Sequence, residues 1–133
     1  MRKQILVIGS SSNVAQDISE CLTNNEYELT GTYNKTNPKN PECYKTLIKI
    51  NFSNKTEIKK LKTLSNVSDV IFTIGKAEFL DEKVSNINYK TLLNLINYLN
   101  SIKNKVRIVF CSSSAVYGNN TSKIIDEKSK KIP

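Results

Sequence analysis

The sequence contains no histidine, and its three cysteines, Cys21, Cys43 and Cys111, lie far apart without any C-x-x-C pairing. The chain therefore lacks the residues for a structural zinc site, a disulfide framework or a histidine-based acid–base mechanism. We expect no metal. An odd number of cysteines that lie far apart in the sequence is typical of proteins in a reducing compartment, and we expect the protein to be cytoplasmic.

Long apolar runs are also missing. No stretch approaches the length that spans a membrane, and residues 1–9 lack the hydrophobic segment of a signal peptide. We therefore expect no membrane partner. At 133 residues the chain is long enough for one domain with a real core.

Arginine is scarce, although the chain carries a formal net charge of +8. Only Arg2 and Arg107 are present, and the lysines are spread along the whole chain. Proteins that bind nucleic acids favour arginine clustered on one face. We expect a lysine-rich solvated surface and no nucleic-acid partner, with some electrostatic attraction for an anionic cofactor or sugar nucleotide.

The stretch Gln4–Ala15 organises the rest of the chain. Its unbroken apolar run, Ile5–Ile8, is typical of a strand that is buried on both faces of a parallel sheet. Gly9 permits a tight turn, and the small residues after it let a ligand approach the backbone. Ser12 or Asn13 can cap the following helix, whose free N–H groups suit a phosphate.

The remaining chain alternates strands with helices. Further strands are expected at Tyr27–Tyr33, Tyr44–Ile50, Val67–Ile74 and Val106–Cys111. Apolar spacing predicts that the first helix buries a face made of Val14, Ile18, Cys21 and Leu22. Asn54 and Glu57 have the spacing of a capping box, and a long helix is expected over Val84–Ser101. This alternation predicts a Rossmann-like doubly wound parallel sheet of order 3-2-1-4-5.

The loop after the first strand resembles that of the short-chain dehydrogenase/reductase superfamily, T-G-x-x-x-G-x-G or T-G-x-x-G-x-x-G. Gly9 matches the first glycine of both patterns. Asn13 and Ala15 stand at the later glycines of the first pattern, and Ser12 and Ala15 at those of the second. The resemblance implies a cofactor, NAD or NADP, whose pyrophosphate rests on the backbone of Ser11–Val14. No G-K-[ST] follows the loop, which argues against a P-loop NTPase.

The segment Ser112–Gly118, SSSAVYG, closely resembles the S-S-S-A-x-V-Y-G segment of the extended short-chain dehydrogenases, the NAD-dependent epimerase/dehydratase family. The resemblance implies that Ser113 is the catalytic serine, whose hydroxyl bonds the substrate hydroxyl undergoing oxidation. Asn88 matches a helix asparagine that helps to order the active site in that family. The alternative is that Asn88 is an ordinary polar residue of an asparagine-rich helix.

The other candidate cofactor-binding residues are Lys35, Asn51, Phe52 and Gly75. The resemblance implies that Asn51 and Phe52 flank the adenine and that Gly75 lines the adenosine. Dinucleotide sites often carry an acidic residue after the second strand, which bonds the ribose. Lys35 stands there instead and would attract a 2′-phosphate, so NADP is favoured over NAD; an ordinary loop lysine is the alternative.

The resemblance covers only the N-terminal half of the family. The catalytic Tyr-x-x-x-Lys pair would lie beyond Pro133, and in a shorter register Asp126 stands in place of the tyrosine. We therefore interpret residues 1–133 as one truncated NAD(P)-binding Rossmann-like domain. It would be the cofactor-binding part of a nucleotide-sugar epimerase, dehydratase or reductase, and we expect it to be inactive alone. By analogy with members of the family, the chain could form a homodimer. A non-catalytic dinucleotide-binding regulatory module and an α/β interaction domain without nucleotide are the alternatives.

Overall fold

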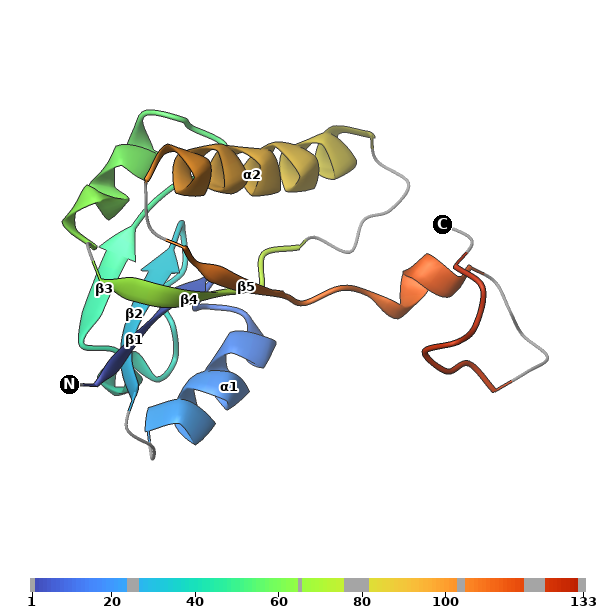
Figure 1. Cartoon of the computed structure of the whole chain (residues 1–133), viewed down its shortest axis with the longest axis horizontal. Coiled ribbons are helices and arrows are strands. Elements are labelled where there is room, and N and C mark those ends of the chain that lie inside the picture. The colour runs from blue at the N-terminus through green and yellow to red at the C-terminus, as the bar shows by residue number, and fades with distance from the viewer. Residues whose placement is uncertain are drawn as a thin grey trace.

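The computed structural model describes residues 2–23, 27–64, 66–75, 82–102, 105–118 and 124–131, and Figure 1 shows the whole chain. Its five strands are β1 (Lys3–Ile8), β2 (Tyr27–Tyr33), β3 (Thr46–Lys49), β4 (Val67–Phe72) and β5 (Arg107–Phe110). They form one sheet of order β3-β2-β1-β4-β5, and every neighbouring pair is parallel. The predicted sheet is confirmed.

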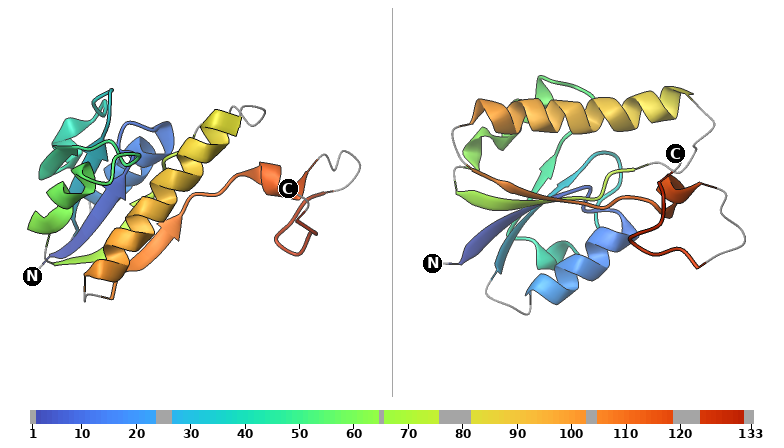
Figure 2. Two further views of the ribbon diagram at one scale, coloured as in Figure 1. Left: turned by 90° about the horizontal axis from the view of Figure 1, so that it is seen from above. Right: turned by 45° about the vertical axis from the view of Figure 1, so that its right-hand side comes forward.

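Helices cover both faces of the sheet. Helix α1 (Asn13–Thr23) lies on one face, and α2 (Glu82–Ser101) lies on the other with the 3₁₀ helix η2 (Glu57–Thr63), as Figures 1 and 2 show. Two short 3₁₀ helices, η1 (Pro41–Cys43) and η3 (Ser114–Tyr117), complete the described elements. The segment with η3 extends beyond the sheet after β5.

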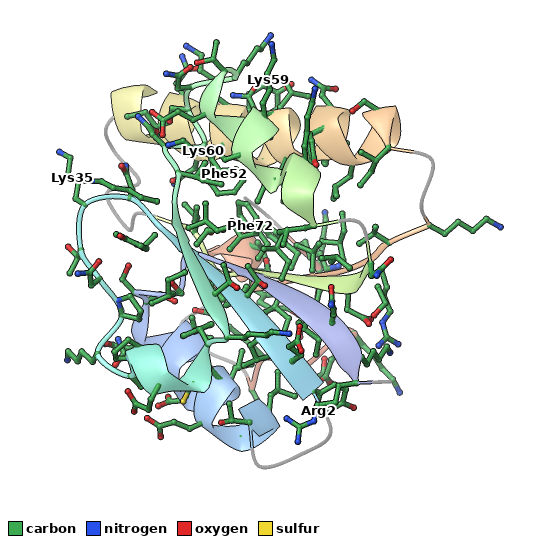
Figure 3. The ribbon with its side chains drawn as sticks, turned by 90° about the vertical axis from the view of Figure 1, so that its left-hand side faces the viewer. Arg2, Lys35, Phe52, Lys59, Lys60 and Phe72 are labelled. Atoms are coloured by element: carbon green, nitrogen blue, oxygen red, sulfur yellow. The ribbon has the colours of Figure 1, made fainter. Side chains whose placement is uncertain are left out.

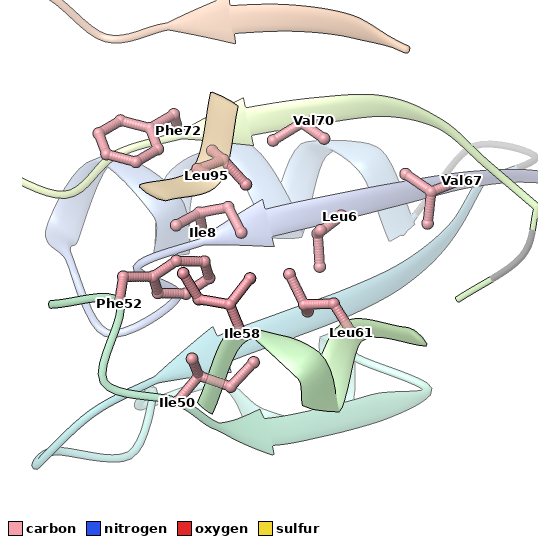
Figure 4. Close-up of a cluster of buried hydrophobic side chains, with 10 residues drawn as sticks. All are labelled: Leu6, Ile8, Ile50, Phe52, Ile58, Leu61, Val67, Val70, Phe72 and Leu95. Carbon is pink, nitrogen blue, oxygen red and sulfur yellow. The ribbon is translucent and has the colours of Figure 1, made fainter. Parts of the chain in front are cut away.

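Alternate residues of β1 enter two separate cores. Leu6 and Ile8 pack in the larger core beneath α2 and η2, which Figure 4 shows in close-up. Ile5 and Val7 point to the opposite face and pack with Ala15 of α1. Because both faces of this central strand are buried, its sequence is continuously apolar, as expected for a parallel sheet.

The buried face of α1 differs from the predicted one. Val14 is 50% exposed and Cys21 is also exposed, whereas Ala15 and Ser19 are fully buried. Ile18 and Leu22 pack beside them. The small side chains at positions 15 and 19 lie one turn apart and let the helix approach the sheet closely.

The capping box predicted at Asn54 and Glu57 is wrong. The Asn54 side-chain oxygen accepts the backbone N–H and the hydroxyl of Thr56, at 3.0 and 2.8 Å. The Glu57 carboxylate instead accepts the backbone N–H of Asn51 at 3.1 Å. This local turn, in which asparagine competes for nearby backbone groups, precedes the 3₁₀ helix η2.

A buried carboxylate joins three strands at the amino end of the sheet. Asp69 of β4 accepts hydrogen bonds from Arg107 Nε at 2.6 Å and from the Ser68 hydroxyl at 2.7 Å, and Lys3 Nζ lies 3.0 Å away. The Ser68 hydrogen bond contributes most to lowering the pKa of Asp69. Burial opposes this shift, and Lys3 and Arg107 lower the pKa further. The cluster ties β1, β4 and β5 together.

Candidate functional site

The candidate site lies at the opposite end of the sheet, beyond the carboxyl ends of the strands. Chain connections run in opposite directions from β1 and β4, so a crevice forms between their ends. A cavity of about 760 Å³ lies there, within the usual range of roughly 300–1,000 Å³ for ligand sites. Most of the predicted cofactor residues line it: Gly9, Ser11, Ser12, Lys35, Asn51, Phe52, Gly75 and Asn88.

Gly9 makes the turn that opens this cavity. Its φ of +88° lies in the left-handed region, which side chains rarely adopt. A Cβ atom there would lie 2.8 Å from the Ile74 side chain and 2.9 Å from the Thr73 hydroxyl. The turn is held to β2, since the backbone N–H groups of Gly9 and Ser10 both donate to the carbonyl of Thr32, at 3.2 and 2.8 Å.

Ser12 caps α1, which resolves the choice between Ser12 and Asn13. Its hydroxyl oxygen accepts the backbone N–H of Ala15 at 3.1 Å, and its carbonyl accepts that of Gln16 at 3.1 Å. Asn13 is the first helical residue and is exposed. Within the described part of the chain, no acceptor is found for the N–H groups of Asn13 and Val14. Such free donors at a helix start can bind an anion.

Ser11 joins the glycine turn to the loop that follows β2. Its hydroxyl donates to the carbonyl of Thr36 at 2.6 Å, across one end of the cavity. Lys35 precedes that residue and is exposed, and Figure 3 shows its side chain extending from the loop. The structure therefore places a lysine charge at the rim where the second strand ends.

Asn51 and Phe52 form a wall that is braced from both sides. The Asn51 side-chain oxygen accepts the N–H of Ser53 at 3.1 Å, and the carbonyl of Phe52 accepts the Asn94 amide at 2.9 Å. Phe52 is only 3% exposed, and its ring belongs to the larger core (Figure 4). The Asn51 N–H, and then Lys60, hold the pKa of Glu57 below its usual value.

A second cavity of about 560 Å³ lies beside the first, and both are lined by Thr73, Ile74, Gly75 and Asn88. Ser113, just after β5, lines this second cavity and is exposed. Val14 lines it from α1. Phe72 and Phe110 stack here with ring centroids 5.5 Å apart, which gives the cavity an apolar side. The fold therefore brings Asn88, Val14 and Ser113 together from three elements.

Sequence reasoning overlooked Thr73. It stands two residues before Gly75, near the end of the strand expected at Val67–Ile74. In the structure its hydroxyl donates to the carbonyls of Ile8 and Gly9, both at 2.9 Å, and accepts a hydrogen bond from the Ser12 hydroxyl. The sequence feature that could have identified Thr73 is a hydroxyl side chain at the end of a strand that lies beside the strand with the glycine turn.

The described residues contain no group of three histidine, cysteine, aspartate or glutamate side chains placed to hold a metal ion. Among the described helices, none combines the length and the apolar character needed to cross a bilayer.

Residues 5–133 match the model of the NAD dependent epimerase/dehydratase family. No curated protein matches the chain. Among solved structures, the UDP-glucose 4-epimerase of Bifidobacterium longum, in complex with NAD+ and UDP, matches with a TM-score of 0.84 and 19% identity. The match covers 97% of this chain and 42% of that enzyme.

Two further solved structures show the same fold. The ADP-L-glycero-D-manno-heptose-6-epimerase of Helicobacter pylori matches with a TM-score of 0.77 and 22% identity, over 98% of this chain and 45% of its own. The Bordetella bronchiseptica enzyme WbmG, in complex with NAD and UDP, matches with a TM-score of 0.76 and 14% identity, over 100% and 44%. The chain thus spans less than half the length of these proteins.

Proposed function

The chain belongs to the NAD dependent epimerase/dehydratase family, and we propose that residues 1–133 bind a nicotinamide dinucleotide across the carboxyl ends of β1 and β4. They would form the cofactor-binding part of a nucleotide-sugar epimerase, dehydratase or reductase. One observation carries the proposal: two adjoining cavities lie at the point where the strand order reverses, and the candidate serine, Ser113, lines the second.

The residues of the first cavity fit the charge and shape of a dinucleotide. The N–H groups of Asn13 and Val14, at the positive end of α1, suit a pyrophosphate. Gly9 lets the backbone approach it, while Asn51, Phe52 and Gly75 line the part assigned to the adenosine. The rest of the cofactor would extend past Asn88 into the second cavity. When bound there, it would supply hydride exchange with the carbon that bears a sugar hydroxyl.

Ser113 would orient that sugar hydroxyl. It lies just before η3, and its carbonyl accepts the N–H of Val116 at 3.2 Å, which fixes the backbone around it. A hydroxyl side chain can position the reacting group, but oxidation also needs a base to accept the proton. No tyrosine of residues 1–133 is followed by a lysine four positions later. We therefore propose that residues 1–133 bind cofactor without turning over a nucleotide sugar on their own.

The cofactor preference depends on Lys35. Its position at the rim, after β2, supports the proposal that NADP binds more tightly than NAD, because a lysine favours a 2′-phosphate where an acidic residue would repel it. Both nucleotide-bound relatives described above hold NAD.

A binding titration with a matched charge change tests the proposed site. NADH and NADPH are titrated separately into the 133-residue chain, and binding is followed by nicotinamide fluorescence. Asn13→Asp adds a negative charge where the pyrophosphate is placed, and we expect it to weaken binding by about tenfold or more. Asn97→Asp makes the same change on the exposed side of α2 and should have little effect. No binding by the wild type, or equal losses in both variants, would contradict the proposal.

A further inference from the structure

Ser12 stands where one loop pattern of the family has a glycine, and its hydroxyl is fully engaged within the protein. The oxygen accepts the Ala15 N–H at 3.1 Å, and the proton is donated to the Thr73 hydroxyl at 2.9 Å. A serine that caps a helix needs only the first of these bonds. The second directs the proton toward the end of β4.

The Thr73 hydroxyl connects the three segments that meet at the turn. It lies 2.9 Å from the carbonyl oxygens of both Ile8 and Gly9, which share its single proton. As an acceptor it receives the proton of Ser12. The end of β1, the glycine turn and the start of α1 are therefore held to one side chain.

Backbone geometry explains why this turn can function without the later glycines. Within the described residues, only Gly9 and Gly118 have positive φ, so neither Ser12 nor Asn13 requires a glycine conformation. At position 12 the serine therefore differs from a glycine only through its side chain, which the turn must accommodate. Ser12 lines the cavity, and its hydroxyl would otherwise have no acceptor for its proton beside the candidate anion site.

We propose that Thr73 is a positioning residue for the dinucleotide. Thr73 accepts a hydrogen bond from the Ser12 hydroxyl and donates to the carbonyls of Ile8 and Gly9, and it thereby fixes the start of α1. There the N–H groups of Asn13 and Val14 are free to bind pyrophosphate. The pair compensates for the serine at a glycine position. This inference rests on the proposed function, and it predicts that Thr73 and Ser12 act together.

A double-mutant cycle on NADH binding tests the pair. We expect Thr73→Val, which keeps the shape but removes the hydroxyl, to weaken binding about tenfold, the change that corresponds to one net hydrogen bond. In the Ser12→Gly background the same substitution should cost less than about threefold, because no serine proton needs an acceptor there. Equal losses in the two backgrounds, or no loss with Ser12 present, would overturn the proposal.

Two further variants separate positioning from general stability. Thr73→Ser retains the hydroxyl and should restore NADH binding to within about threefold of the wild type. Thr23→Val removes a hydroxyl at the far end of α1, which donates to the Ser19 carbonyl at 2.8 Å, and should leave binding unchanged. Failure of Thr73→Ser to restore binding would show that the methyl group, not the hydroxyl, matters.

Amide hydrogen exchange tests separately the structural step of the proposal, that Thr73 fixes Ser12 at the start of α1, whereas a wild type that binds no NADH would refute the proposed function. The Ala15 N–H is protected by Ser12, so loosening Ser12 should expose it. We expect Thr73→Val to speed exchange of the Ala15 amide about tenfold relative to the Ser19 amide in the middle of α1. An unchanged ratio of the two rates would overturn the role assigned to Thr73.

Discussion

At the scale of single residues, the shape of the candidate site depends most on Gly9. Its positive φ and the close approach of Thr73 and Ile74 both exclude a side chain. Gly75 lines the same cavity, but a Cβ atom there would meet nothing within 4 Å. The two glycines therefore differ in how strongly their backbone position excludes a side chain, although the resemblance assigned both of them to the cofactor site.

This difference predicts unequal effects of alanine. Gly9→Ala should lower the free energy of unfolding by about 2–4 kcal/mol, through left-handed strain and steric overlap. Gly75→Ala, the matched control, should change it by less than about 1 kcal/mol. Urea unfolding monitored by circular dichroism measures both, and similar losses in the two variants would show that the Gly9 turn is not constrained as described.

Lys35 allows a second test at the residue scale. Lys35→Glu should weaken NADPH binding by tenfold or more and NADH binding far less, because only NADPH carries the 2′-phosphate. Lys39→Glu makes the same charge change on the same loop, but Lys39 does not line the cavity. Equal losses for both cofactors with Lys35→Glu would mean that Lys35 contributes only general positive charge.

At the scale of elements, the alternation of apolar strands and helices was sufficient to predict the sheet. Five strands were expected and their order and direction are confirmed, because buried parallel strands carry continuous apolar runs. The predicted face of α1 was half right: Ile18 and Leu22 pack against the core, but the small residues Ala15 and Ser19 are buried in place of Val14 and Cys21. The capping box expected at Asn54 and Glu57 did not form, because the Asn54 side-chain oxygen instead accepts the backbone N–H of Thr56.

The cluster around Asp69 predicts how stability depends on pH. A carboxyl whose pKa is lower in the folded state stabilises the fold fully above its unfolded pKa, about 3.9. That contribution is lost as the pH falls through the lower folded pKa. At pH 7, Asp69→Asn should therefore reduce the free energy of unfolding by about 1–3 kcal/mol, and the difference from wild type should shrink below about pH 4.

Urea unfolding of both proteins between pH 7 and pH 2 measures this difference. Asp17→Asn serves as the control because Asp17 is an exposed carboxylate on α1. If the difference in free energy of unfolding between wild type and Asp69→Asn stayed constant down to the lowest pH, the ionised carboxyl would not be what stabilises the strands.

Strand β5 predicts how the 133-residue chain behaves in solution. Within the described residues it pairs only with β4, and Ile108, Val109 and Phe110 are 38%, 49% and 49% exposed. An exposed apolar edge strand tends to pair with another chain. We expect concentration-dependent self-association in sedimentation velocity, reduced by Val109→Lys. A monomer at all concentrations, with a high melting temperature, would contradict this expectation.

At the scale of the whole molecule, the candidate site was predicted in outline but not in detail. The loop and the SSSAVYG segment, far apart in sequence, pointed to two parts of one site, and the fold places Gly9 and Ser113 in adjoining cavities. The hydroxyl pair of Ser12 and Thr73 could not be predicted, because it joins residues 61 positions apart at the ends of different elements. Such a contact becomes visible only when the strand register is known.

The central claim is that a dinucleotide binds across the carboxyl ends of β1 and β4, and nuclear magnetic resonance can test it directly. The ¹⁵N-labelled chain is titrated with NADH, and changes in amide chemical shift are assigned along the sequence. We predict the largest changes at residues 9–14, with further changes at Lys35, Asn51, Gly75 and Ser113. Saturation of the chain without changes at residues 9–14, or changes confined to the amino end around Asp69, would contradict the account.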